Sequence, residues 1–258
     1  MNEIPHYKSF EFSPKRSKYC VIIHVINEGD RIKNQLLRMR NCAYDIIISD
    51  GGSTDGATSQ ESMKDLGINT LLITQCGFGI QMRASFDFAL NRGYLGIITI
   101  DGNNKDSVEN IQDFADKLDA GYGFIQGSRF MSGGHHKNTP KYRLWAIKCI
   151  HVPLSRLSSK FRFTDSTNGF RAYSAKYLCD TRLDIFRDIF QTYDIQFYMT
   201  IKASRLGYKV CEIPVTRIYP KHGKIPTKVS LFGNFSVLWR FIKVLIGRYN
   251  PKRKKLES

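Results

Sequence analysis

Two short acidic motifs in the chain could bind a phosphorylated ligand. The segment Asp50-Gly-Gly-Ser-Thr-Asp55 follows an apolar run at 45–49, and Asp101-Gly-Asn103 follows another at 95–100. Glycine lets a ligand approach the backbone closely, and carboxylates can accept hydrogen bonds from a base, a ribose or a helix N-terminus. A carboxylate and an amide at the spacing of Asp101 and Asn103 also suit Mg²⁺ or Mn²⁺ bridging a diphosphate. Each motif alone is equally compatible with an ordinary turn.

The elements around these motifs alternate in a regular order. Apolar, β-rich runs predict strands at 19–25, 45–49, 69–74, 95–100 and 122–127. Helical spacing predicts helices at 30–40 and from the turn at 77–79 to residue 91. Capping-box spacing at Thr58 to Glu61 and at Asp106 to Glu109 predicts that a helix opens at each, the second ending near residue 118. Later in the chain we expect helices at about 142–157 and 193–206 and a strand at 208–214.

This alternation predicts a single α/β domain with a largely parallel sheet and helices on both faces. The polar loops that follow strands then share one rim of the sheet, where such folds bind ligands. Those loops are 27–30, 50–55, 75–79, 101–106 and 128–140. Two acidic strand ends on one rim favour a binding site far more than either motif alone.

A glycine pair at Gly77 and Gly79 invites comparison with a dinucleotide-binding fingerprint, because it follows a strand and opens a helix. The third glycine position of that fingerprint holds Met82, where a small residue is required. The sequence therefore does not predict dinucleotide binding here.

The composition is that of an ordinary globular protein. The chain has 258 residues, 42% of them hydrophobic, which is enough for a sizeable core. Its six cysteines are scattered without a CxxC pair, so we expect reduced thiols and no structural zinc. The first thirty residues lack the pattern of a signal peptide, which favours a cytoplasmic protein.

The net charge of +16 is concentrated near the C-terminal end. Eleven Lys or Arg residues lie between 216 and 258, against the single acid Glu257. Residues 231–247 combine apolar side chains with a polar stripe at helical spacing, but they are too short and too charged for a membrane span. An amphipathic helix followed by the basic run 252–255 fits the anionic inner face of the plasma membrane. A helix docked on the core with a basic tail is the alternative.

Six motifs in order along about 19–228 resemble those of the family 2 glycosyltransferases of GT-A fold, in the branch of the polyprenyl-phosphate (dolichol-phosphate mannose synthase-like) enzymes. They are Val21 to Glu28, Asp50 to Asp55, Gly77 to Gly79 with Arg83, Asp101 to Asn103, Gly127 to Arg129 with Gly133 and Gly134, and Asp165 to Arg171. Four positions depart from the family's pattern: His24 replaces Pro, Gly51 and Asn103 each replace Asp, and Lys105 stands where a Gln metal ligand is common.

The resemblance implies a GT-A catalytic domain over 19–228, an N-terminal extension at 1–18 and the amphipathic helix and basic tail at 229–258. It implies inverting transfer of a sugar from a UDP- or GDP-type donor. The residues implied in binding the donor nucleotide are Asn27, Glu28, Asp50, Gly52, Ser53, Asp55, Gly79, Arg83, Asp101 and Gly102. Asp101 and Asn103 would hold Mg²⁺ or Mn²⁺, and Arg217 and Lys228 would contact the diphosphate.

The acceptor decides the rest of the chemistry. A sugar hydroxyl must lose a proton, and Asp165 is the candidate base. A lipid phosphate is already anionic and needs cations to hold it, for which Arg129 and Arg143 are the candidates. We therefore expect a polyprenyl-phosphate or saccharide acceptor, in cell-surface glycan synthesis.

Two other functions stay open at this point. The basic C-terminal block is also compatible with a nucleic-acid-binding protein, although its aromatic residues lie in the apolar helix and not among exposed cations. Gly51 and Asn103 are compatible with a degenerate family member that binds nucleotide without transferring sugar.

Overall fold

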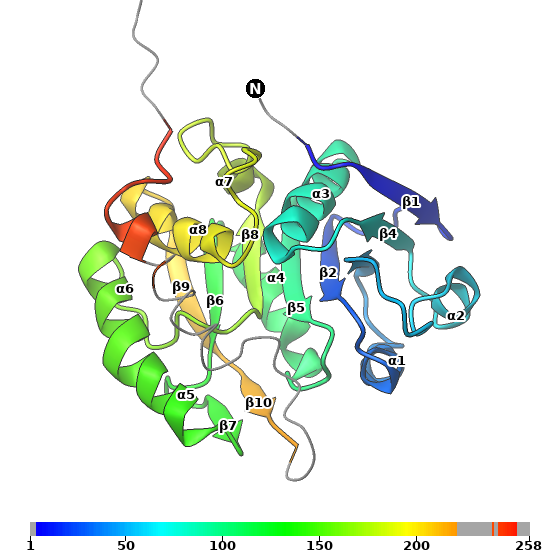
Figure 1. The fold of residues 1–258 in the computed structure, drawn as a ribbon, viewed down its shortest axis with the longest axis horizontal. Helices are drawn as coiled ribbons and strands as arrows, with labels where there is room; N and C mark the ends of the chain where they lie inside the picture. Colours follow the sequence, from blue (N-terminus) through cyan, green and yellow to red (C-terminus); the bar gives the residue numbers. More distant parts are fainter. Residues whose placement is uncertain (1–3, 221–238, 240–241, 252–258) are drawn as a thin grey trace, which may run out of the picture.

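A computed structural model describes residues 4–220, 239 and 242–251. Its centre is an eight-stranded sheet in the order β1-β4-β3-β2-β5-β8-β6-β9 (Figure 1). The strands are β1 (Tyr7–Glu11), β2 (Tyr19–Val25), β3 (Asp45–Asp50), β4 (Thr70–Thr74), β5 (Gly96–Asp101), β6 (Phe124–Ser128), β8 (Arg171–Ser174) and β9 (Val210–Pro214). A separate parallel pair joins β7 (His135–Lys137) to β10 (Thr216–Ile218).

The predicted parallel sheet is confirmed, with two antiparallel additions. The strands β4, β3, β2 and β5 run parallel in sequence-predicted positions, and β6 is parallel to β9. The strand β1 pairs antiparallel with β4 at the edge, and β8 lies antiparallel between β5 and β6. Neither β1 nor β8 was predicted, because β1 has polar alternate residues and β8 has only four residues.

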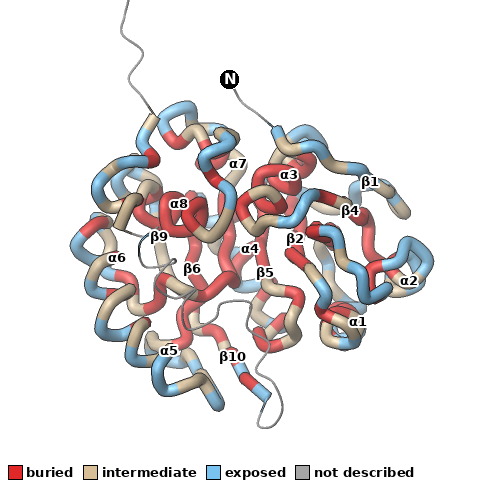
Figure 2. Tube along the Cα trace, viewed as in Figure 1, coloured by how far each residue is buried: buried red, intermediate tan, exposed pale blue. Residues whose placement is uncertain are grey.

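Helices cover both faces of the sheet, as expected. The strand β2 shows why: its alternate residues belong to two separate cores, Cys20 and Ile22 on one face and Val21 and Ile23 on the other. The first face packs against α3 (Phe78–Asn91), α7 (Ala175–Leu178) and α8 (Asp194–Arg205), and the second against α1 (Asp30–Arg38), α2 (Gln60–Asp65) and α4 (Ile111–Asp119). Figure 1 shows α3 and α8 in front of the sheet, and Figure 2 shows burial concentrated in the strands between the layers.

The two predicted capping boxes are wrong. Thr58 does not cap a helix: its hydroxyl donates to Asp50 Oδ2 over 2.7 Å, and Ser59 caps α2 by accepting from the Ser62 amide. Asp106 lies in a buried ion pair with Arg217, and a 3-10 turn, η1 (Val108–Asn110), precedes α4. In both cases a tertiary partner competes successfully for the side chain that local spacing assigned to the helix.

The helix expected at 142–157 is present in three segments: α5 (Lys141–Ala146), a π-helical turn η2 (Ile147–His151) and α6 (Val152–Ser158). The predicted C-terminal helix at 231–247 and Lys228 lie mostly outside the described residues. Within the described part, Val244 and Tyr249 pack into the core, and the Tyr249 ring stacks on Phe190 with centroids 5.5 Å apart. None of the helices among the described residues is long and apolar enough to cross a membrane.

Candidate functional site

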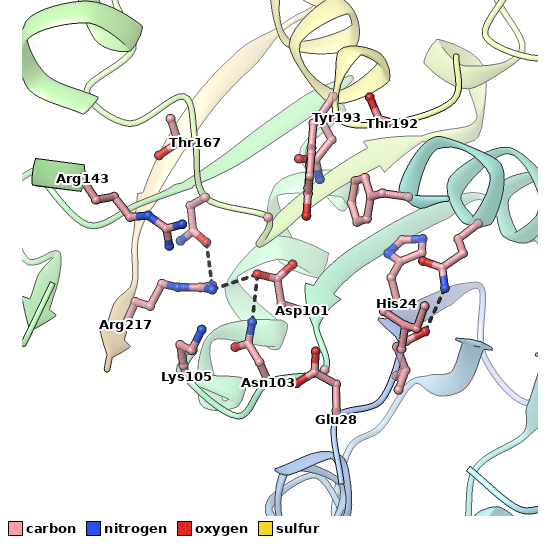
Figure 3. A pocket seen from close by; sticks show the side chains of 18 of the residues that line it. His24, Glu28, Asp101, Asn103, Lys105, Arg143, Thr167, Thr192, Tyr193 and Arg217 are labelled. Carbon is pink, nitrogen blue, oxygen red and sulfur yellow. Dashed lines mark hydrogen bonds and ion pairs between the residues drawn. The ribbon is translucent and has the colours of Figure 1, made fainter. Parts of the chain in front are cut away.

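A cavity of about 420 Å³ opens at the carboxyl ends of the parallel strands (Figure 3). Its wall comes from the ends of β2, β5 and β6, the turn before α3, the segment before β8 and the residues after β10. The cavity lies where β2 and β5 are neighbours in the sheet. The helix that follows β2, α1, and the helix that follows β4, α3, lie on opposite faces of the sheet. The cavity therefore lies at the topological switch point, where such sheets bind ligands. The predicted rim is therefore present.

The second acidic motif lies in this cavity beside Arg217, a residue that is distant from it in the sequence. Asp101 ends β5, and its Oδ2 accepts from Arg217 Nη2 at 2.9 Å and from Asn103 Nδ2 at 3.3 Å. Arg217 Nη1 also donates to Asp106 Oδ2 over 2.5 Å. Burial alone would raise the pKa of the Asp101 carboxyl, but Arg217 and then Lys105 hold it below its usual value. The guanidinium thus forms a bridge between two carboxylates, as Figure 3 shows for Asp101.

A second, deeper ion pair joins Arg129 to Asp165. Arg129 Nε and Nη2 donate to the two Asp165 oxygens over 2.6 and 2.9 Å. The Arg129 and Thr167 amides donate to the same carboxylate. Asp165 is fully buried and does not line the cavity, whereas Arg129 does. Burial would raise the pKa of Asp165, but the charge and bonds of Arg129 lower it.

Tyr219 lies among the cations of the cavity. Lys105 Nζ is 4.9 Å from the ring centroid, and the guanidinium carbons of Arg217 and Arg143 are 5.7 and 6.0 Å from it. Arg143 Nη1 also donates to the Tyr219 hydroxyl over 3.0 Å. Burial would raise the pKa of Tyr219, but Arg217, Arg143 and Arg129 outweigh burial and lower it to about 8. This end of the cavity therefore gathers three cationic side chains around one ring, an arrangement that suits an anion.

The first acidic motif has a different place. Asp50 is buried and accepts from the Ser53 amide and hydroxyl and from Thr58. Asp55 Oδ2 accepts from the Gly29 amide over 2.8 Å, and Asn27 Oδ1 accepts from the Thr54 amide over 2.7 Å. These bonds join the loops after β2 and β3. Asn27, Asp50, Gly52, Ser53 and Asp55 therefore shape the rim beside the cavity and are absent from its described wall.

The remaining predicted residues divide between the wall and the core. Glu28 and Gly102 line the cavity, and Glu28 Oε2 accepts from Arg31 Nε over 2.9 Å. Gly79 lies in the first turn of α3, where an added Cβ would be 2.6 Å from the Phe190 carbonyl oxygen, so its role visible here is close packing. Arg83 is buried in α3 and does not line the cavity.

Sequence reasoning missed much of the apolar and aromatic wall. Phe78 stacks on Tyr193 with centroids 4.8 Å apart, and His24 meets Phe78 edge-on at 5.2 Å. Further wall residues not predicted are Gln81, Lys105, Ala146, Ile147, His151, Asn168, Gly169, Gln196, Phe197 and Tyr219. Lys105, Asn168 and Gly169 lie in or beside motifs that could have indicated them. Tyr219 follows β10, and the others come from helices whose sequences are those of ordinary amphipathic elements.

Gln81 and Gly51 form a complementary pair. An added Cβ at Gly51 would be 2.3 Å from Gln81 Nε2. That amide nitrogen donates to the Val25 carbonyl over 2.8 Å. Gln81 therefore fills the room that a side chain at 51 would need, which explains in physical terms why the second Asp of the family's motif is missing.

The expected Mg²⁺ or Mn²⁺ does not fit the donor set well. Asn103 Oδ1 is buried without a partner among the described residues and could accept a cation. Asp101 Oδ2 is already engaged by Arg217 at 2.9 Å, so a divalent ion at that oxygen would meet a fixed positive charge. Over the described part of the chain, no group of three or more His, Cys, Asp or Glu side chains could hold a metal ion.

Comparisons with known proteins agree with this geometry. The chain is 29% identical over 203 residues to the polyprenol monophosphomannose synthase of Mycolicibacterium smegmatis, covering 76% of each. It is 27% identical over 222 residues to the undecaprenyl-phosphate mannosyltransferase of Micrococcus luteus, covering 84% of this chain and 90% of the relative. The chain is therefore similar in sequence to proteins named as polyprenyl-linked mannose-transferring enzymes. The resemblance read from its motifs and its class of activity, glycosyl transfer, are thereby confirmed.

Two further comparisons add nothing to the assignment of this glycosyltransferase. No protein-family model matches the chain. A solved structure provisionally named a nucleotide-diphospho-sugar transferase, from Desulfovibrio desulfuricans G20, aligns with a TM-score of 0.46 at 13% identity, covering 92% of this chain and all of that one. The α/β fold of the glycosyltransferase therefore rests on its own sheet topology.

Proposed function

We propose that the protein transfers a sugar from a nucleotide-diphosphate donor to a polyprenyl phosphate. The cavity has the two chemical regions that this reaction needs. Its cationic end, with Lys105, Arg129, Arg143 and Arg217, suits phosphate groups. Its other wall, built from Phe78, Ala146, Ile147, Tyr193 and Phe197, suits an apolar chain. One relative is named a polyprenol monophosphomannose synthase and the other an undecaprenyl-phosphate mannosyltransferase, which supports a polyprenyl-phosphate acceptor here.

The bonding of Asp165 carries the choice of acceptor. A hydroxyl acceptor needs a base that reaches the cavity. Both Asp165 oxygens are bonded to Arg129 inside the protein, and the side chain is fully buried. We therefore treat Asp165 as a positioning residue that aims Arg129 at an anionic acceptor. A phosphate needs no base, since its oxygen is already a nucleophile.

The proposed reaction is a single displacement with inversion. A phosphate oxygen of the acceptor attacks the anomeric carbon as the bond from that carbon to the donor's β-phosphate oxygen breaks. The products are a glycosyl polyprenyl phosphate and a nucleoside diphosphate, and no proton changes place. Arg129 and Arg143 hold the attacking phosphate, while Arg217 and Lys105 stabilise the charge on the leaving diphosphate.

The donor nucleoside is proposed to lie against the loops after β2, β3 and β4. Glu28 and Gly102 face it in the cavity wall, and the bonded loops carrying Asn27, Asp50 and Asp55 give that wall its shape. Gly52, Ser53, Gly79 and Arg83 support it from behind, and Lys228 is proposed as a further diphosphate contact beyond the described residues. Mannose is the first sugar to test, because both relatives are named for it.

The C-terminal part is proposed to keep the enzyme at an anionic membrane surface from the cytoplasmic side. With it we propose three parts of the chain: an N-terminal extension at 1–18, the catalytic domain at 19–228, and the amphipathic helix and basic tail at 229–258. Its support is the basic block after residue 216 together with an acceptor class that resides in lipid.

The proposed function is tested in two steps. A thermal-shift screen with UDP-, GDP-, CDP- and dTDP-sugars should identify one donor that stabilises the protein selectively. The radiolabelled donor is then incubated with undecaprenyl phosphate or with undecaprenol, which lacks the phosphate. Label should enter lipid only with the phosphate. Stabilisation by a donor without transfer to either lipid would instead favour the nucleotide-binding, non-transferring alternative.

A further inference from the structure

We propose that Arg217 takes the place of the divalent ion, so that the donor diphosphate binds without metal. Two cationic side chains support the inference: Arg217, whose guanidinium is held between two carboxylates, and the neighbouring Lys105. This inference rests on the proposed nucleotide-diphosphate donor and specifies how its charge is neutralised.

The Arg217 guanidinium is held between two carboxylates, as a metal ion would be in a metal site. Arg217 Nη2 lies 2.9 Å from Asp101 Oδ2 and Nη1 lies 2.5 Å from Asp106 Oδ2. The Arg217 side chain is only 7% exposed, so its charge acts in a low-dielectric wall. Asp101 itself is 31% exposed and faces the cavity. Asp101 and Asp106 are thus positioning residues for a cation that guanidinium chemistry keeps charged at every working pH.

The other positions of the motif favour the same arrangement. Asn103 contributes a neutral amide where the family's pattern has a second carboxylate, so the negative charge available to a divalent ion is halved. Lys105 adds a buried ammonium to the same wall, 4.9 Å from the Tyr219 ring. Arg217 and Lys105 balance the carboxylates of Asp101 and Asp106. The wall therefore offers no excess negative charge to a divalent ion, while its two cations can donate hydrogen bonds to a diphosphate.

A metal ion that used Asp101 Oδ2 would have to displace Arg217. The Asp106 carboxylate is buried, and Arg217 is its ion-pair partner. Moving the guanidinium away would leave that carboxylate without its charge partner in the interior, which is unfavourable. The backbone adds to this constraint, because Arg217 lies in the short parallel pair of β10 with β7 and forms a bridge with Asp106.

The test measures nucleotide binding rather than turnover. Isothermal titration of the full chain with UDP and with GDP is done in EDTA and in Mn²⁺. We expect one of them to bind with a Kd that differs by less than about twofold between the two conditions. Binding that is lost in EDTA and restored by Mn²⁺, by about tenfold or more, would overturn the inference.

A double variant provides the gain-of-function arm. Asn103→Asp with Lys105→Gln restores the family's residues, and it should bind Mn²⁺ in paramagnetic-resonance titrations where the parent does not. In EDTA its nucleoside diphosphate affinity should fall by about tenfold, and Mn²⁺ should restore it. Lys64→Gln, which makes the same charge change as Lys105→Gln but on the exposed face of α2, should match the parent in both measurements. Mn²⁺ binding by the parent itself at the donor site would contradict the inference.

The two proposals fail differently. If neither nucleoside diphosphate binds in EDTA or in Mn²⁺, the proposed donor is wrong and the inference falls with it. If the nucleotide binds only with Mn²⁺, the proposed function survives and the inference does not. Should the double variant fail to fold, seen as loss of its thermal unfolding transition, the EDTA and Mn²⁺ comparison on the parent still decides the question.

Discussion

Replacing Asp165 with Asn tests whether this residue positions Arg129 or acts as a base. The change leaves the Arg129 charge buried without its counter-ion, since the two side chains are 0% and 2% exposed. It also turns one acceptor oxygen into an NH₂ group that faces the donors of Arg129. Breaking one partner of a buried ion pair lowers the free energy of unfolding by about 3 to 5 kcal/mol. The expected loss for Asp165→Asn lies in that range.

The assay combines stability with steady-state kinetics. Urea unfolding gives the free energy of unfolding, and sugar transfer is measured at a temperature where both proteins are folded. Because Arg129 loses its orientation, the KM for polyprenyl phosphate should rise by about tenfold or more, while the KM for the donor should change little. If Asp165 were a base, the activity of the parent would rise with pH as the carboxyl lost its proton, and Asp165→Asn would remove that rise. We expect no such difference between the two pH profiles.

A surface pair supplies the matched control. Glu109→Gln breaks the ion pair with Arg38, whose partners are 67% and 37% exposed, and should cost no more than about 1 kcal/mol. If Asp165→Asn keeps its stability within about 1 kcal/mol of the parent but abolishes kcat, the base assignment is right and the positioning account is refuted.

Three further outcomes are expected. Gly79→Ala brings a methyl group to 2.6 Å from the Phe190 carbonyl oxygen, so thermal unfolding should show a loss of about 1 to 3 kcal/mol; unchanged stability would contradict the packing role. Gly169→Ala places a methyl group 2.5 Å from Asp101 Oδ1, so titration calorimetry should show donor affinity falling by about tenfold, with a much smaller effect on the melting temperature. Burial lowers the pKa of His24 to about 4. An unfolded histidine titrates near 6.5, so the unfolded state binds the extra proton and stability falls as pH drops from about 6.5 towards 4. Urea unfolding of His24→Leu should recover roughly 2 kcal/mol of the stability lost between about pH 7 and about pH 5, and an unchanged loss would refute this.

The parallel half of the fold was predictable because its signals are local. The strands β2 to β5 are continuous apolar runs. The polar loops that follow them predict which edge of the sheet binds the ligand. The strand β8 was not predictable, because Arg171 and its neighbours are defined by their place between β5 and β6 rather than by a periodic pattern. The capping boxes failed for the same reason, since Asp106 finds its partner in Arg217, more than a hundred residues away in sequence.

The residues of the candidate site that belong to recognisable motifs were predictable from the sequence. Asp101, Arg129 and Arg217 were identified, and the structure brings them into one cavity wall. What spacing could not show is which carboxylate each arginine meets. That pairing moves Asp165 from the role of a base towards a support for Arg129, and it makes Arg217 a competitor of the expected metal.

Transfer of label from the identified nucleotide-sugar to undecaprenyl phosphate tests the central claim most directly. We expect a lipid-linked, acid-labile sugar to form in EDTA as well as in Mn²⁺, together with release of the nucleoside diphosphate. We also expect no product with undecaprenol and a large loss of product in Arg129→Ala. Transfer of equal efficiency to undecaprenol or to a saccharide hydroxyl would contradict the proposal that an anionic phosphate is the acceptor.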